Sequence, residues 1–125
     1  MCVVGASGDD LNEYSLSASF DVSYSSYVQN FSVATQDNTP NGMSFNNDGT
    51  KMFVVGDQGN DINEYSLSTA FNVSTASYVQ NFSVYAQESS PEGITFNNDG
   101  TKMYVIGNLG DDVNEYSLDN PAVQT

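Results

Sequence analysis

Residues 91–105 read PEGITFNNDGTKMYV, and residues 40–54 read PNGMSFNNDGTKMFV. In both stretches a short apolar run is followed by the tetrad Asn-Asn-Asp-Gly and then by a second run that is rich in β-branched and aromatic residues. Asp-Gly between two such runs is a strong signal for a tight antiparallel hairpin. The two stretches therefore predict paired strands at 93–97 with 102–107 and at 42–46 with 51–56.

The hairpin belongs to a tandem repeat of 51 residues. When residues 1–67 are aligned with residues 52–118, 43 of the 67 pairs are identical and no gap is needed. Each repeat adds two more strand-like runs, and no apolar pattern at helical spacing competes with them. These runs lie at 113–118 (copies 62–67 and 11–16) and at 78–84 (copy 27–33). The chain is predicted to be all-β.

A repeat of about 50 residues with four antiparallel strands is typical of a β-propeller blade. A β-solenoid is the alternative, but the Asp-Gly hairpin turn disfavours it. We expect one propeller segment over residues 1–125, with a partial blade 1 at 1–34, blade 2 at 35–85 and a partial blade 3 at 86–125. A propeller needs at least about four blades to close. The 125 residues of this chain cover about 2.5 repeats, so the segment is predicted to be incomplete.

The stretch at 91–105 resembles the Pro-x-Gly…Asp-Gly…Tyr-Val signature of the YVTN and NHL-type propeller repeats. This resemblance implies a propeller fold. It says little about function, because such proteins range from binding scaffolds and surface-layer proteins to lactonase-like enzymes. The Asn-Glu-Tyr-Ser-Leu element and the absence of Trp set the chain apart from WD40 repeats.

The incomplete blades at both ends predict self-association. Open strand edges and apolar faces are usually covered by pairing with another chain. We expect a homo-oligomer that closes into a ring, with a dimer as the first choice and a trimer as the second. Strand exchange or open aggregation is the competing outcome.

The composition excludes several classes of function. Sixteen Asp and Glu against two Lys and Arg give a net charge of −14, which disfavours nucleic acid and anionic membranes as partners. The absence of His and the single Cys exclude an internal disulfide, Cys/His zinc sites and His-dependent catalysis. With no apolar run of 18 residues and no signal peptide in view, we expect a soluble chain, secreted or attached to a surface only as part of a longer protein.

The loops before the third strand of each repeat carry acidic residues. The candidate metal ligands are Asp10, Asp61 and Asp112, which occupy equivalent repeat positions. Clustered carboxylates suit Ca²⁺, although the spacing matches neither the EF-hand nor the Gly-Gly-x-Gly-x-Asp repeat. A calcium ion is one interpretation of these loops, and a plain solvated turn is the other. No further cofactor is expected.

Other repeated residues are predicted to be structural. The two cations, Lys51 and Lys102, should each form an ion pair with a nearby carboxylate within a blade or between blades, and an anion contact is the alternative. The repeat-equivalent Glu13, Glu64 and Glu115 should likewise be structural. The repeated tyrosines should fill the packing between blades, or line shallow sugar sites. These tyrosines are Tyr14, Tyr65, Tyr116, Tyr27 and Tyr78.

The near-identity of the repeats favours a non-catalytic module for binding or structural scaffolding. One active site needs different groups in different places, whereas near-identical blades place identical groups around the ring. We expect part of a larger repetitive microbial or viral protein that presents its loops to a protein or a glycan. We predict no catalytic residue. The alternative function is a lactonase-like or hydrolase-like propeller enzyme with a metal on its axis.

Overall fold

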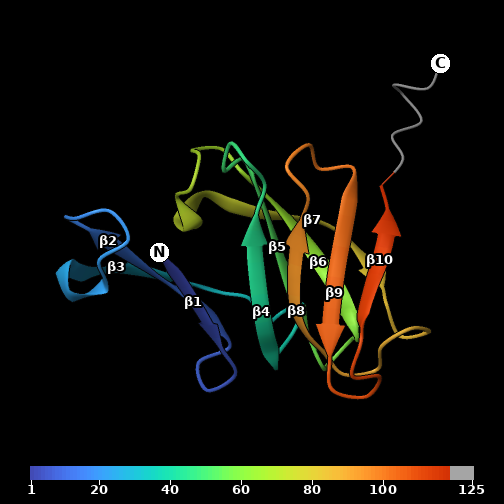
Figure 1. Ribbon diagram of the computed structural model, residues 1–125. Helices are drawn as coiled ribbons and strands as arrows, with labels where there is room; N and C mark the ends of the chain where they lie inside the picture. Colours follow the sequence, from blue (N-terminus) through green and yellow to red (C-terminus); the bar gives the residue numbers. More distant parts are fainter. Residues whose placement is uncertain (119–125) are drawn as a thin grey trace.

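The computed structural model describes residues 1–118, which form three antiparallel sheets (Figure 1). The first sheet contains β1 (Cys2–Gly5), β2 (Asp10–Leu16) and β3 (Ser25–Ser32). The second contains β4 (Pro40–Phe45), β5 (Lys51–Gly56), β6 (Asp61–Leu67) and β7 (Ala76–Ser83). The third contains β8 (Pro91–Phe96), β9 (Lys102–Gly107) and β10 (Val113–Ser117). The all-β prediction is confirmed.

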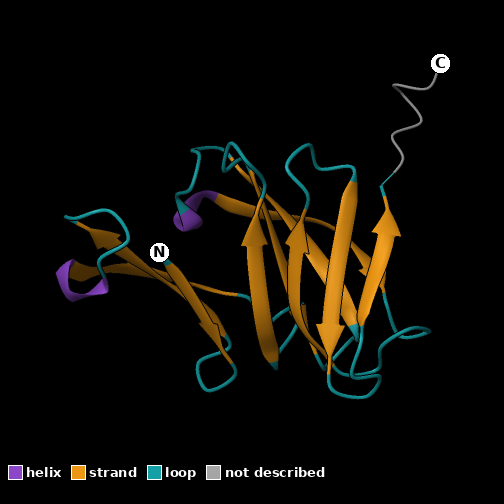
Figure 2. Cartoon of the chain, in the orientation of Figure 1, coloured by secondary structure: helices purple, strands orange, loops and turns teal. Residues whose placement is uncertain are grey.

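Strands follow one another in chain order within every sheet, and among the sheets formed by residues 1–118 only the second has four strands. The first sheet lacks a strand equivalent to β4. The third lacks one equivalent to β7 within residues 1–118, and the last seven residues of the predicted blade 3 lie outside the described part of the chain. Two short 3₁₀ turns, η1 (Val22–Tyr24) and η2 (Val73–Thr75), precede the fourth strand of the first two repeats (Figure 2).

The repeated hairpin forms as the sequence predicts. Gly49 and Gly100 adopt φ values of 74° and 71°, which the absence of a Cβ allows. Asp48 accepts hydrogen bonds from the backbone N–H of Thr50 (3.0 Å) and from its hydroxyl (2.6 Å). These bonds lower the pKa of the Asp48 carboxyl. The turn is therefore closed by its own side chains, and β4 pairs with β5 from Phe45 opposite Met52 onward.

The core consists of two apolar clusters, each of which joins neighbouring sheets. One includes Leu11 of the first sheet and Val54 and Tyr65 of the second, and the other includes Ile62 of the second and Val105 of the third. The second sheet therefore packs on both faces, whereas the outer sheets pack on one. No helix within residues 1–118 has the length and apolar character that crossing a membrane requires.

Candidate functional site

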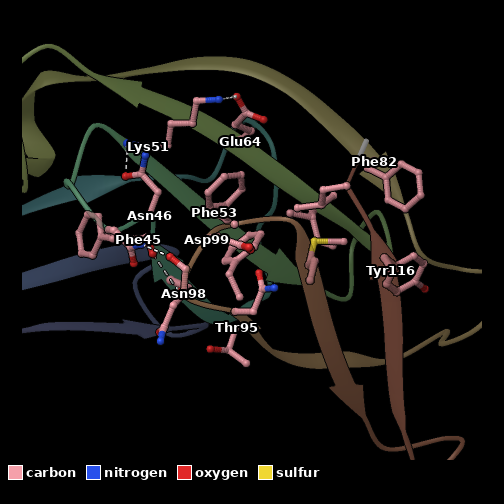
Figure 3. A pocket seen from close by; sticks show the side chains of 18 of the residues that line it. Phe45, Asn46, Lys51, Phe53, Glu64, Phe82, Thr95, Asn98, Asp99 and Tyr116 are labelled. Carbon is pink, nitrogen blue, oxygen red and sulfur yellow. Dashed lines mark hydrogen bonds and ion pairs between the residues drawn. The ribbon is translucent and has the colours of Figure 1, made fainter. Parts of the chain in front are cut away.

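A groove of about 970 Å³ opens between the second and third sheets (Figure 3). The β4–β5 and β8–β9 turns lie at one end of it, and side chains of β6 and β7 line its wall. The amide of Asn47 donates a hydrogen bond to the Asn98 carbonyl and so links the two turns. Aromatic rings and amide groups dominate this surface, which suits binding through contact and hydrogen bonds.

Two aromatic pairs bridge the sheets at the groove. The rings of Phe53 and Phe96 lie 4.6 Å apart between centroids, and those of Phe82 and Tyr116 lie 5.7 Å apart in an edge-to-face arrangement. Such pairs stabilise beyond the area that they bury. They hold the two sheets in register around the groove.

The polar wall of the groove is an ion pair with an amide beside it. Lys51 Nζ lies 3.8 Å from Glu64 Oε2 (Figure 3), and Gln80 Nε2 donates to Glu64 Oε1 at 3.1 Å. Lys102 pairs with Glu115 in the same way at 3.3 Å. The predicted ion pairs within blades are thus confirmed. Glu13, which no lysine reaches, accepts hydrogen bonds from Gln29 Nε2 and from the backbone N–H of Val73, both at 3.2 Å.

The three candidate calcium ligands lie in three different sheets and contact amides. Asp61 accepts from Asn63 Nδ2 at 3.1 Å and from Asn81 Nδ2 at 2.7 Å. Asp10 has the equivalent partners Asn12 and Asn30, and Asp112 accepts from Asn114. Within residues 1–118, no three His, Cys, Asp or Glu side chains gather closely enough to share a metal. Asp10 and Asp61 thus fasten neighbouring strands, whereas Asp112 bonds the nearby Asn114, and calcium binding stays a prediction.

The repeated tyrosines divide into two groups. Tyr65 is buried and packs edge-to-face on Phe31 of the first sheet, with centroids 5.8 Å apart. Burial, together with Tyr78 and two nearby aspartates, raises the pKa of Tyr65. Tyr27 and Tyr78 instead remain 57% and 43% exposed. The prediction that the tyrosines fill the packing between blades is wrong for these two, which lie on the outermost strands of their sheets, β3 and β7, and pack on Tyr14 and Tyr65 of the same sheets.

Two buried carboxylates, Asp37 and Glu88, were not predicted from the sequence. They occupy equivalent positions one repeat apart, and the acidic residue that the two repeats share there could have pointed to them. Glu88 accepts hydrogen bonds from the backbone N–H groups of Ser90 (2.8 Å), Leu109 (3.3 Å) and Gly110 (3.4 Å). These bonds, chiefly that from Ser90, lower the pKa of Glu88. Glu88 thereby ties the loop before β10 to the segment before β8.

Among the described residues, the Asp37 carboxylate bonds only Thr39, in the segment before β4, and does not reach the β5–β6 loop as Glu88 reaches the β9–β10 loop. Its Oδ1 accepts from Thr39 N–H at 2.7 Å, whereas its Oδ2 is buried without a hydrogen-bond partner. We expect Asp37→Glu to raise the free energy of unfolding by about 1 kcal/mol, because the longer side chain brings its second oxygen toward the loop and removes an unsatisfied buried acceptor. Urea denaturation measures the change. Glu88→Asp is the matched control and should lower stability; the interpretation fails if both variants shift stability in the same direction.

No protein-family model matches the chain, and no curated protein sequence matches it either. Several solved structures do match the chain. The β-propeller domain of Cps50 (Swd1), named as from Myceliophteria thermophila, matches 95% of this chain with a TM-score of 0.58 and 13% identity. The periplasmic gluconolactonase PpgL of Pseudomonas aeruginosa matches 95% with a TM-score of 0.61 and 13% identity. A protein of unknown function from Desulfotomaculum acetoxidans matches 85% with a TM-score of 0.56 and 17% identity.

Identities this low establish the fold alone. The chain spans 38%, 35% and 34% of those three chains, respectively. Coverage of about a third of each propeller agrees with the three adjoining sheets of residues 1–118, of which only the second has four strands. The chain has the fold of an incomplete β-propeller.

Proposed function

We propose that the chain is a non-catalytic β-propeller module that serves binding or structural scaffolding and assembles with further copies into a ring. The observation that carries this proposal is the use of its repeated charged residues. Lys51, Glu64 and Asp61 all contact partners within their own sheet, as do their counterparts in the third sheet. These charged side chains are thus engaged in contacts within the sheets and are not directed at a substrate.

The two outer sheets support the assembly part of the proposal. Val3 of the first sheet is 49% exposed, and Val113 and Leu109 of the third are 63% and 70% exposed. The second-sheet equivalents of the two valines, Val54 and Ile62, are buried between neighbouring sheets. A further blade on either side would remove this apolar surface from water, at about 25 cal/mol per Å². A dimer is the first choice and a trimer the second.

A lactonase is the second candidate function, and it is favoured by the likeness to the gluconolactonase PpgL. An axial metal would require different carboxylates from several blades. The described carboxylates do not converge in that way.

Light scattering coupled to size-exclusion chromatography tests the proposal, once in EDTA and once in millimolar Ca²⁺. We expect a discrete species of two chain masses, and no acceleration of gluconolactone hydrolysis over buffer. A dependence of the mass on Ca²⁺ would support the calcium prediction at Asp10, Asp61 and Asp112. A monomer at all concentrations would refute the assembly, and metal-dependent lactone hydrolysis would favour the enzyme.

A further inference from the structure

The chain itself occupies the space between the first and second sheets. The segment 68–75, which joins β6 to β7, contacts both of them there. Phe71 packs edge-to-face on Phe45 with centroids 5.3 Å apart, and its N–H donates to the Gly49 carbonyl at 2.9 Å. The Phe71 ring lies where a Cβ on Gly49 would stand. The absence of a side chain at Gly49 therefore lets the Phe71 ring pack directly on the backbone of the turn.

The same segment also binds the preceding sheet. Val73 is fully buried, and its N–H donates to Glu13 Oε1 at 3.2 Å. Asn72 Oδ1 accepts from Gln29 Nε2 at 2.8 Å. A Phe-Asn-Val sequence thus fills a groove whose partners are a Phe, a Gly, a Glu and a Gln.

The groove between the second and third sheets has all four partners, each one repeat later. They are Phe96, Gly100, Glu64 and Gln80. A Cβ added to Gly100 would meet no atom within 4 Å, so no described residue takes the place that Phe71 takes on Gly49. Glu64 Oε1 already accepts from Gln80, as Glu13 does from Gln29. Within residues 1–118, this is a built site that the chain does not fill.

A matching segment lies exposed at the other end of the molecule. Phe20-Asp21-Val22-Ser23 is the copy of Phe71-Asn72-Val73-Ser74 one repeat earlier, in the loop at the end of the first sheet that lies away from the other sheets (Figure 2). Phe20 is 101% exposed and Val22 is 65% exposed, whereas Val73 is buried. The chain therefore presents a free copy of the segment that fills the equivalent groove.

The exposed segment already has the conformation of the buried one. Phe20 has a φ of 58° and Phe71 one of 60°, which is uncommon for a bulky residue. Asp21 accepts from Ser23 N–H at 3.1 Å, just as Asn72 accepts from Ser74 N–H at 3.1 Å. A segment that is pre-organised in this way loses little conformational freedom on binding.

We propose that the groove between the second and third sheets binds the segment Phe20–Ser23 of a second copy of this chain. Phe20 packs on Phe96 over Gly100, Val22 fills the wall, and the Asp21 carboxylate accepts a hydrogen bond from Gln80. This docking rests on the proposed function, because it specifies the contact through which the modules assemble. Since both partners are acidic, added salt should strengthen the association by screening their repulsion.

Residues 119–125 are the competing occupant. They continue from Leu118, which lines the groove, and stand at the repeat positions of 68–74. The sequence has Ala122 where Phe71 stands and Gln124 where Val73 stands. This segment therefore lacks both apolar anchors, and the second copy is the better-matched occupant.

Sedimentation velocity on the wild-type chain, Phe20→Ala and Tyr85→Ala tests the docking. We expect Phe20→Ala to raise the dissociation constant of the dimer by roughly tenfold to a hundredfold, as loss of an aromatic anchor does. Tyr85 is also exposed, at 63%, and does not line the groove, so Tyr85→Ala should change the constant less than about twofold. Both variants remove exposed side chains, and circular dichroism checks that they fold.

A peptide of residues 17–25 provides the direct measurement. Titrated into the Phe20→Ala protein, it should shift the NMR amide signals of Phe96 and Gly100, and a peptide carrying the same substitution should not. Binding that appears only after deletion of residues 119–125 would assign the groove to that segment and overturn the proposal. A Phe20→Ala protein that still dimerises like the wild type overturns the docking but leaves the proposed assembly standing. A wild-type monomer overturns both.

Discussion

Replacing Tyr65 with alanine is expected to lower the free energy of unfolding by about 3–5 kcal/mol, the range for deleting a buried aromatic side chain. Tyr65 is 1% exposed and packs edge-to-face on Phe31, so its ring joins the first two sheets. Its hydroxyl donates to Gln36 Oε1 at 3.0 Å. The substitution removes packing from both sheets and leaves a cavity between them. Since small domains are stable by only about 5–15 kcal/mol, this loss is a large share of the total stability.

Tyr116 provides a matched comparison for Tyr65. It stands at the same repeat position, packs on Phe82 at 5.7 Å and donates to Gln87 Oε1 at 3.1 Å. Tyr65 is also covered by Tyr78 of β7, and because the third sheet has no equivalent of β7 within residues 1–118, Tyr116 is only partly buried. Tyr116→Ala should therefore cost about 1–2 kcal/mol, and Tyr85→Ala less than about 0.5 kcal/mol. Urea denaturation followed by circular dichroism gives all three values, and equal losses at Tyr65 and Tyr116 would contradict this account.

The features that could be predicted from the sequence are those that depend on local chemistry. The Asn-Asn-Asp-Gly turn predicts the β4–β5 and β8–β9 hairpins because Asp and Gly satisfy the turn without help from the rest of the chain. The 51-residue period then predicts how many strands each sheet receives. An ion pair for each lysine was also predicted, and the structure identifies the partners of Lys51 and Lys102 as Glu64 and Glu115 on the neighbouring strands.

The features that could not be predicted depend on which neighbour each sheet has. Phe20 and Phe71 have equivalent positions and the same backbone conformation, yet only Phe71 packs over a glycine. Repeat identity cannot distinguish them, because burial is decided by the adjoining strands. The buried Asp37 and Glu88 were missed since carboxylates are seldom fully buried. The groove was missed because its walls come from two repeats, and only the packed sheets place them opposite each other.

Replacing Gly42 with alanine is the second change expected to lower stability strongly, because neighbouring sheets approach closely at their inner strands, β4 and β8. A Cβ on Gly42 of β4 would lie 2.5 Å from the Glu92 carbonyl oxygen and 3.1 Å from the Gly93 Cα, both in the backbone of β8. Backbone atoms cannot move aside as a side chain can, so Gly42→Ala must push the second and third sheets apart. We expect a loss of about 1–3 kcal/mol in unfolding free energy, as for other overpacked sites, with a matching loss of the aromatic contact between Phe53 and Phe96.

Gly93 separates this steric effect from the intrinsic effect of alanine in a strand. It is the repeat equivalent of Gly42, and a Cβ there would meet only the Ile106 side chain, at 3.2 Å. Alanine is favoured over glycine in a strand by roughly 0.5–1 kcal/mol, which offsets the small shift that Ile106 must make. Gly93→Ala should thus be close to neutral in urea denaturation of the monomer at low concentration. Because the two glycines lie at the same register of equivalent hairpins, the difference between the two variants isolates the close approach of one sheet to the next. Equal stability of the two variants would show that the inner strands do not meet as described.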